Sequence, residues 1–118
     1  MLAAVTLDPL FKVRCEPRGD AVVVVASGEI DLATSPRLRA ELLKDEAQAP
    51  NVVLDLRQVT FIDSSGLGVI VGQQKRSQED GRSFSIAVDG TTAVQRILDL
   101  SGLNKILDVV SDPAERLV

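Results

Sequence analysis

Short runs rich in valine and isoleucine alternate along the chain with longer segments whose apolar residues recur at helical spacing, and this alternation limits the possible folds more than any other feature. The runs at residues 21–28, 51–56 and 84–88 have the length and β-branched content of buried strands. Helical spacing follows each of them, within residues 34–48, 65–81 and 91–102. Strands that alternate with helices pair in parallel through right-handed crossovers, so the pattern predicts an α/β fold.

The beginning and the end of the chain add smaller elements. Apolar and charged residues alternate over residues 11–16, which is typical of a half-buried strand. Arg-Gly-Asp at 18–20 predicts a turn, so this strand forms an antiparallel hairpin with the next one. A last strand within 105–110 and a short helix at 112–118 complete the order. We predict one domain over residues 1–118, with a mixed, mostly parallel sheet of four to five strands and helices packed against it.

Each predicted helix has end signals and an apolar stripe. The first begins at Thr34 or Ser35, with Pro36 in its first turn, where a missing N–H has no cost. Gly81 and Gly102 end the second and third helices. The side chains expected to face the core are those of Leu38, Leu42, Leu43, Leu67, Ile70, Val71, Val94, Ile97 and Leu98.

The composition excludes several classes of function. Histidine is absent, which removes Ser-His-Asp and Cys-His catalysis and imidazole metal sites. Cys15 is the only cysteine, so no internal disulfide can form, as fits a reducing compartment. The net charge is −4 and the sequence has no basic stripe, which argues against nucleic acid as a partner. No apolar run approaches the ~18 residues of a membrane helix, so we expect a cytoplasmic protein without membrane contact.

The motif DSSGLG, residues 63–68, is an unusual place for a helix to begin, because glycine costs a helix interior about 1 kcal/mol relative to alanine. The motif lacks the G-x-S-x-G order of a nucleophile elbow, and serine without a base is a weak nucleophile. It also lacks the lysine of a phosphate-binding loop and the spacing of a dinucleotide site. An N-cap by Asp63 or a serine explains one of its residues. Two serines and two glycines in one turn also favour a bare surface that a partner or a kinase can approach.

Four acidic residues gather near the predicted strand ends. Glu29 and Asp31 follow the second strand, Asp55 lies in the third, and Asp63 stands where the third strand ends. Their spacing matches no calcium loop, so we predict no metal site. Two interpretations of Glu29 and Asp31 stay open at this level: a solvated loop rim, or a patch that faces a partner.

Three stretches together resemble STAS-domain anti-anti-sigma factors, which are also called anti-sigma factor antagonists. They are GEIDLATSPRLRAEL at 28–42, VVLDLRQVTFIDSSGLGVIVG at 52–72 and AVQRILDLSGLNKIL at 93–107. The middle stretch is the most specific, and all three follow the order expected of the family. The resemblance covers about residues 11–112 and implies a single STAS-like domain with its core in that range.

The resemblance implies a partner-switching module that is not an enzyme and needs no cofactor. In such proteins an anti-sigma factor with serine kinase activity phosphorylates the first serine of the pair, here Ser64, and Ser65 is the weaker candidate. The unphosphorylated form binds the anti-sigma factor and frees its sigma factor. Phosphorylation reverses this, and a metal-dependent serine phosphatase restores binding. The residues implied in partner binding are Glu29, Asp31, Asp63, Ser64, Ser65, Gly66 and Leu67.

Two alternatives stay open beside this hypothesis. One is a STAS scaffold that binds its partners without phosphorylation, and the other is a nucleotide-binding STAS regulatory module. Saturable binding of GTP or ATP would favour these alternatives, whereas phosphate on Ser64 would favour partner switching.

Overall fold

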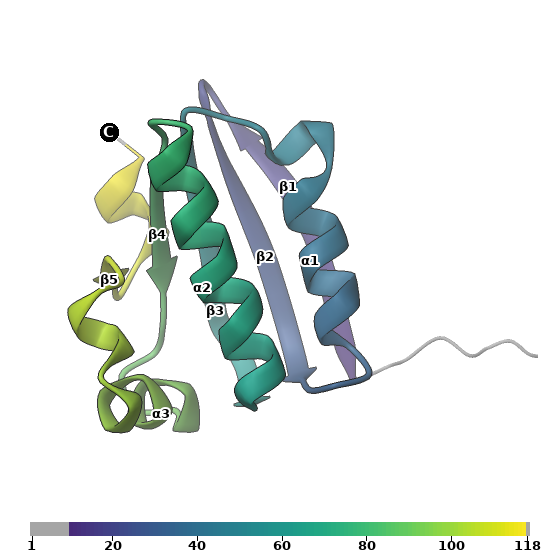
Figure 1. Ribbon diagram of the computed structural model, residues 1–118, viewed down its shortest axis with the longest axis vertical. Coiled ribbons are helices and arrows are strands. Elements are labelled where there is room, and N and C mark those ends of the chain that lie inside the picture. Colours follow the sequence, from purple (N-terminus) through teal and green to yellow (C-terminus); the bar gives the residue numbers. More distant parts are fainter. Residues whose placement is uncertain (1–9, 118) are drawn as a thin grey trace, which may run out of the picture.

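The computed structural model describes residues 10–117, and its elements follow the predicted order (Figure 1). The strands are β1 (Phe11–Arg18), β2 (Ala21–Ile30), β3 (Asn51–Ile62), β4 (Ser83–Ala87) and β5 (Val109–Val110). The helices are α1 (Ser35–Leu43), α2 (Ser64–Glu79) and α3 (Ala93–Ser101), with short 3-10 turns η2 (Asp45–Ala47), η3 (Leu103–Lys105) and η4 (Pro113–Arg116). The other residues of the predicted domain, 1–9 and 118, lie outside this description.

The five strands form one sheet in the order β1-β2-β3-β4-β5. β1 pairs with β2 in antiparallel fashion, and the other neighbours pair in parallel. This confirms the predicted α/β fold with a mixed, mostly parallel sheet. Because right-handed crossovers follow the strand order along the chain, α1 and α2 lie side by side on the same face of the sheet (Figure 1).

The main core lies between this face and the helices. Alternate residues of the two central strands point into it, among them Val24 of β2 and Leu54 of β3, which have no exposed surface. The interior is mostly aliphatic, and Phe11 and Phe84 are the aromatic residues buried in it within the described chain. The helices contribute Leu38, Leu42, Ile70, Val94 and Leu98.

Four side chains predicted to face the core are less buried than expected. Leu43 and Val71 are exposed, and Leu67 and Ile97 are half-buried. The buried face of α2 instead includes Gln73 and Ser77, and Gln73 Nε2 donates a hydrogen bond to Ser77 Oγ at 3.1 Å. Each of these two polar groups satisfies the other, which offsets the cost of removing them from water. Apolar spacing alone could not identify a polar pair of this kind.

β3 is longer than predicted, because it ends at Ile62 and not at residue 56. Its second half continues to pair with β2 across two register shifts. Gly28 stands at one of them with a φ of +93°, and a Cβ there would lie 1.7 Å from the carbonyl oxygen of Leu10. Only glycine fits so close to another backbone segment at this φ. The longer strand carries the chain directly to Asp63.

The opposite face of the sheet has a smaller apolar cluster. It consists of Val23, Val25 and Val53, with Leu117 packed against them. The end of the described chain therefore covers part of the face that α1 and α2 leave open. Within residues 10–117, no helix has both the length and the apolar character needed to cross a membrane.

α2 packs closely on the sheet at Gly66. A Cβ added there would lie 2.6 Å from Ile30 Cγ2 and 2.7 Å from Ile62 Cγ1. A Cβ added at Gly68 would meet no atom within 4 Å. One glycine of the motif is therefore required by packing, and the other faces open space.

Gly66→Ala should lower the free energy of unfolding by about 1–3 kcal/mol, because the added methyl group overpacks the contact with the two isoleucines. Gly68→Ala is the matched control and should raise it by up to about 1 kcal/mol, because alanine is the better helix former. Urea denaturation measures both changes. Equal effects of the two substitutions would contradict the close packing at Gly66.

Candidate functional site

Asp63 connects the end of β3 to the beginning of α2. Its backbone N–H donates to the carbonyl of Ile30 at 3.1 Å, which joins it to the end of β2. Its Oδ1 accepts from the backbone N–H groups of Ser65 at 2.9 Å and Gly66 at 3.4 Å. These N–H groups have no partner inside the helix, so Asp63 is the N-cap that the sequence allowed.

The two serines of the motif differ in what their hydroxyl groups do. Ser65 is half-buried, and its Oγ donates a 2.5 Å hydrogen bond to Asp63 Oδ1. Ser64 is the first residue of α2 and is exposed, and its hydroxyl has no partner among residues 10–117. Ser64 is therefore the accessible hydroxyl at this site, whereas that of Ser65 is engaged in the cap.

The carboxyl group of Asp63 keeps its charge well into acid. Its pKa is lowered, first by the hydrogen bond from the Ser65 hydroxyl and further by the backbone N–H groups of Gly66, Ser65 and Leu32. A negative charge is therefore present next to Ser64 at neutral pH. The interaction with Leu32 also connects the cap to the loop between β2 and α1.

That loop is fixed by Asp31. Its Oδ1 accepts from the backbone N–H groups of Ala33 and Thr34, both at 3.0 Å. Thr34 Oγ1 donates to the carbonyl of Glu29 at 2.8 Å. The predicted cap at Thr34 is correct in position but not in mechanism, because the Thr34 side chain makes no capping bond to α1. The side chain that does bond to the loop backbone is that of Asp31. Leu32, the next residue in this loop, is 79% exposed.

The acidic residues do not all belong to this end of the sheet. Glu29 lies opposite Phe61 near the end of β2, and Asp31 follows two residues later. Asp55 is buried within β3 and makes two hydrogen bonds to the Arg57 guanidinium, at 2.9 and 3.0 Å. Asp55 is therefore a paired structural charge and not part of the group at the strand ends. No three acidic or cysteine side chains in the described range are grouped as a metal site would require.

We use the name Ser64 surface for the predicted partner-binding residues at this end of the sheet. Ser64 is exposed; Glu29, Asp31, Asp63, Ser65 and Leu67 are half-buried, and Gly66 is buried under the first turn of α2.

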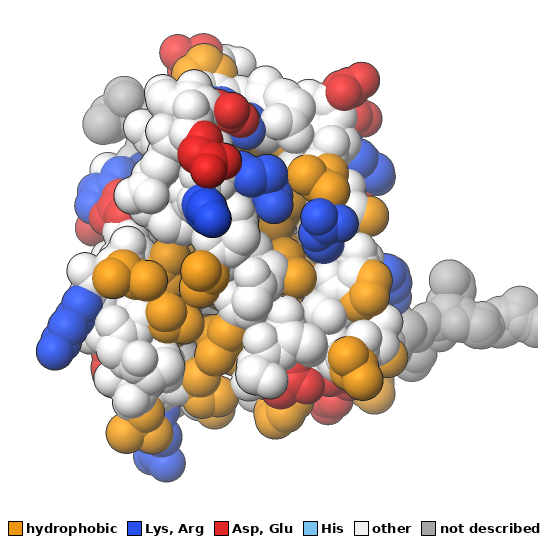
Figure 2. Space-filling view, viewed as in Figure 1, with side chains coloured by type: hydrophobic (Ala, Val, Ile, Leu, Met, Phe, Trp, Pro, Cys, Tyr) orange, Lys and Arg blue, Asp and Glu red, His pale blue; other side chains and the backbone are white. Residues whose placement is uncertain are grey.

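Sequence reasoning missed two exposed apolar neighbours of this surface, Leu32 and Phe61, of which Phe61 is 44% exposed. Two features of the sequence could have identified them: Leu32 is a leucine in a turn, and Phe61 occupies an outward-facing position of a strand. Figure 2 also shows hydrophobic side chains gathered on the lower part of the helical face, towards the end where α2 begins. Exposed apolar groups around a polar centre are common where proteins dock.

The chain is similar to known proteins along most of its length. The STAS domain matches residues 12–115. An anti-sigma F factor antagonist of Paenibacillus polymyxa is 36% identical over 111 residues, which cover 91% of this chain and 92% of that protein. An anti-sigma-B factor antagonist of Bacillus subtilis (strain 168) is 33% identical over 88 residues, or 75% of this chain and 80% of that protein.

The fold is also found in solved structures. The crystal structure of an anti-sigma factor antagonist from Mycobacterium paratuberculosis matches with a TM-score of 0.80 and 26% identity, and the match covers 91% of both chains. Sequence and structure comparisons therefore agree on one family.

Ser65→Ala should raise the pKa of Asp63 towards its ordinary value near 3.8, because the largest cause of the lowered pKa is removed. The lowered pKa makes Asp63 stabilise the fold above its unfolded-state pKa, and this contribution is lost as pH falls through the folded-state pKa. In Ser65→Ala this contribution should be smaller, and its loss should be complete at a higher pH. Carboxyl NMR titration measures the pKa, and Ser64→Ala is the control, with no change expected. The same Asp63 pKa in Ser65→Ala and wild type would contradict the assignment of the cap.

Proposed function

The chain belongs to the STAS-domain family of anti-sigma factor antagonists, and from this membership we propose that it binds an anti-sigma factor through the Ser64 surface and so frees a sigma factor. Members of this family are regulatory proteins and not enzymes. In the proposed cycle the anti-sigma factor is also a serine kinase that phosphorylates Ser64, and a metal-dependent serine phosphatase reverses the modification. We place this cycle in the cytoplasm.

One observation carries the choice of site: the hydroxyl of Ser64 is free and that of Ser65 is not. A kinase must bring the hydroxyl oxygen in line with the phosphate it transfers, so the oxygen has to be accessible. Ser64 meets this condition without any rearrangement. Modification of Ser65 would first break its 2.5 Å bond to Asp63 and disrupt the cap.

A phosphate on Ser64 would change the surface and leave the fold in place. It adds about −1.5 to −2 charges at neutral pH. The helix N-terminus favours an anion, which offsets part of the repulsion from Asp63. The N–H groups of Ser65 and Gly66 already donate hydrogen bonds to Asp63, so they have a partner whether or not the phosphate is present.

The same phosphate would strongly oppose docking. A partner that covers the Ser64 surface would bury a hydrated dianion beside the charged Asp63, and burying an unpaired charge is costly. Leu32, Phe61 and Leu67 would supply the apolar contacts that favour docking when no phosphate is present. Gly66 is buried, so in this proposal it sets the position of the helix and does not touch the partner.

Ser64→Asp should weaken binding to the cognate anti-sigma factor at least about tenfold, or roughly 1.4 kcal/mol, because it adds a charge at the centre of the interface. Ser64→Ala should bind as wild type does without ATP, and should keep binding when ATP is added. Calorimetric titration with and without ATP measures these affinities.

Ser65→Ala is the matched control, since it leaves Ser64 available and should still accept phosphate from the kinase. Peptide mapping of the modified protein locates the phosphate. Phosphate on Ser65 alone, or none on residue 64, would contradict the site. Saturable binding of GTP or ATP to the isolated protein would instead support the nucleotide-binding alternative.

A further inference from the structure

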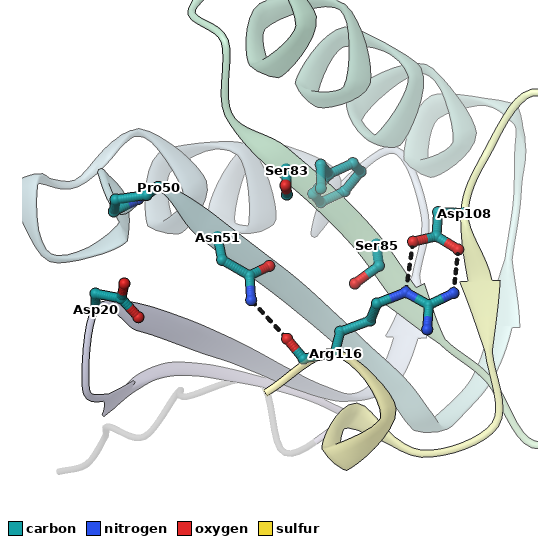
Figure 3. Close-up of a pocket in the computed structure, with 8 residues that line it drawn as sticks. Asp20, Pro50, Asn51, Ser83, Ser85, Asp108 and Arg116 are labelled. Carbon is teal, nitrogen blue, oxygen red and sulfur yellow. Dashed lines mark hydrogen bonds and ion pairs between the residues drawn. The ribbon is translucent and has the colours of Figure 1, made fainter. Parts of the chain in front are cut away.

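A polar cleft lies far from the Ser64 surface (Figure 3). It begins where β3 begins, at Asn51, whereas Ser64 follows the other end of this 12-residue strand. At ~3.3 Å per residue, the strand separates the two by roughly 36 Å. The cleft lies on the face of the sheet opposite α1 and α2, because Ser85 pairs with Val53 of the far-face cluster. It is lined by Asp20, Pro50, Asn51, Ser83, Phe84, Ser85, Asp108 and Arg116.

One wall of this cleft contains a fork between a carboxylate and a guanidinium. Arg116 Nε donates to Asp108 Oδ2 and Arg116 Nη2 donates to Asp108 Oδ1, both at 2.8 Å. Asn51 Nδ2 donates to the Arg116 carbonyl at 2.6 Å, which anchors the backbone of η4 to β3. Two parallel hydrogen bonds of this kind are specific to a guanidinium, because an ammonium cannot form the same planar fork.

Beside the fork lies a buried hydroxyl without a partner. Ser85 is 2% exposed, and its Oγ makes no hydrogen bond within the described chain. Figure 3 shows this hydroxyl pointing from β4 towards the Arg116 side chain, which lies across it. Buried hydroxyls are nearly always satisfied, so an unsatisfied one marks a place where a further group fits. The Arg116 side chain is 41% exposed and can leave without disturbing the core.

The charges and free acceptors of the cleft favour a cation with N–H donors. Asp108 and Arg116 neutralise each other, and Asp20 is exposed without an ion-pair partner in residues 10–117, so the net charge is −1. The amide oxygen of Asn51 and the hydroxyls of Ser83 and Ser85 add acceptors. The cavity measures about 500 Å³, which lies within the range of small-molecule sites. An anion would meet net repulsion here.

We propose that this cleft is a guanidinium-binding site, that Arg116 occupies it in the free protein, and that a guanidino group from outside replaces Arg116 on Asp108 and bonds to Ser85. The contact between Arg116 and Asp108 indicates which chemical group the cleft binds, because Asp108 already accepts two hydrogen bonds from a guanidinium in the fork geometry. The incoming group comes either from a free guanidino compound or from an arginine side chain of another protein. The site is independent of the Ser64 surface and of its proposed phosphorylation.

The test is calorimetric titration of the whole chain with agmatine, which is a free guanidino compound, and with acetyl-Gly-Arg-Gly-amide, which presents an arginine side chain. Arg116→Gln removes the internal competitor and should tighten binding of the preferred probe at least about tenfold relative to wild type. Asp108→Asn should abolish binding, and Ser85→Ala in the Arg116→Gln background should weaken it. Tighter binding of the peptide assigns the site to a protein partner, and tighter binding of agmatine assigns it to a free compound.

Three controls keep the proposal falsifiable. Asp45→Asn makes the same charge change at an exposed position elsewhere and should leave binding intact. Putrescine, an ammonium probe, should bind more weakly than agmatine, and inorganic phosphate should not bind. Amide NMR spectra verify that each variant is folded and should show the shifts at residues 83–85. The proposal is overturned if Arg116→Gln binds neither probe better than wild type, or if Asp45→Asn reduces binding as much as Asp108→Asn.

Discussion

The hydrogen bonds of the Asp63 carboxylate hold together the end of the sheet at which the Ser64 surface lies. One oxygen accepts from the N–H groups of Ser65 and Gly66 and from the Ser65 hydroxyl, while the Asp63 N–H is fixed to Ile30 on the neighbouring strand. These bonds set where α2 begins and which serine stays free. Because the Ser65 hydroxyl is hydrogen-bonded to Asp63, the exposed hydroxyl in the first turn of α2 is that of Ser64.

The contacts that stabilise the fold are thereby separate from the proposed site of modification. The parts that determine the fold, such as the packing of Gly66 on Ile30 and Ile62, lie beneath the first turn of α2. The part proposed to change, Ser64, is exposed, and its hydroxyl makes no hydrogen bond within residues 10–117. A charge added there acts on whatever docks at this end and not on the core. The guanidinium cleft lies on the other face, so the two sites can act separately.

Much of the fold could be predicted from the sequence, because periodicity and end signals are local. The order of the elements and Gly81 and Gly102 as helix ends follow from such local signals. Ser64 as the candidate residue followed only from the family resemblance, and it stays a prediction. The buried Gln73–Ser77 pair could not be predicted, because it depends on which polar groups meet across a helix turn. Nor could the separation of Asp55 from the other acids, or the cleft at Ser85, because these follow from strand register and from where the end of the chain packs.

The most direct test of the central claim compares the phosphorylated and unphosphorylated proteins in two measurements on the same samples. Urea denaturation gives the free energy of unfolding, and titration with the anti-sigma factor gives the affinity. We expect phosphate on Ser64 to leave the free energy of unfolding within about 0.5 kcal/mol of that of the unphosphorylated protein, as for other surface changes. We also expect the affinity to fall at least about tenfold. A phosphorylated protein that is markedly less stable, or that binds its partner as tightly as before, would contradict the central claim.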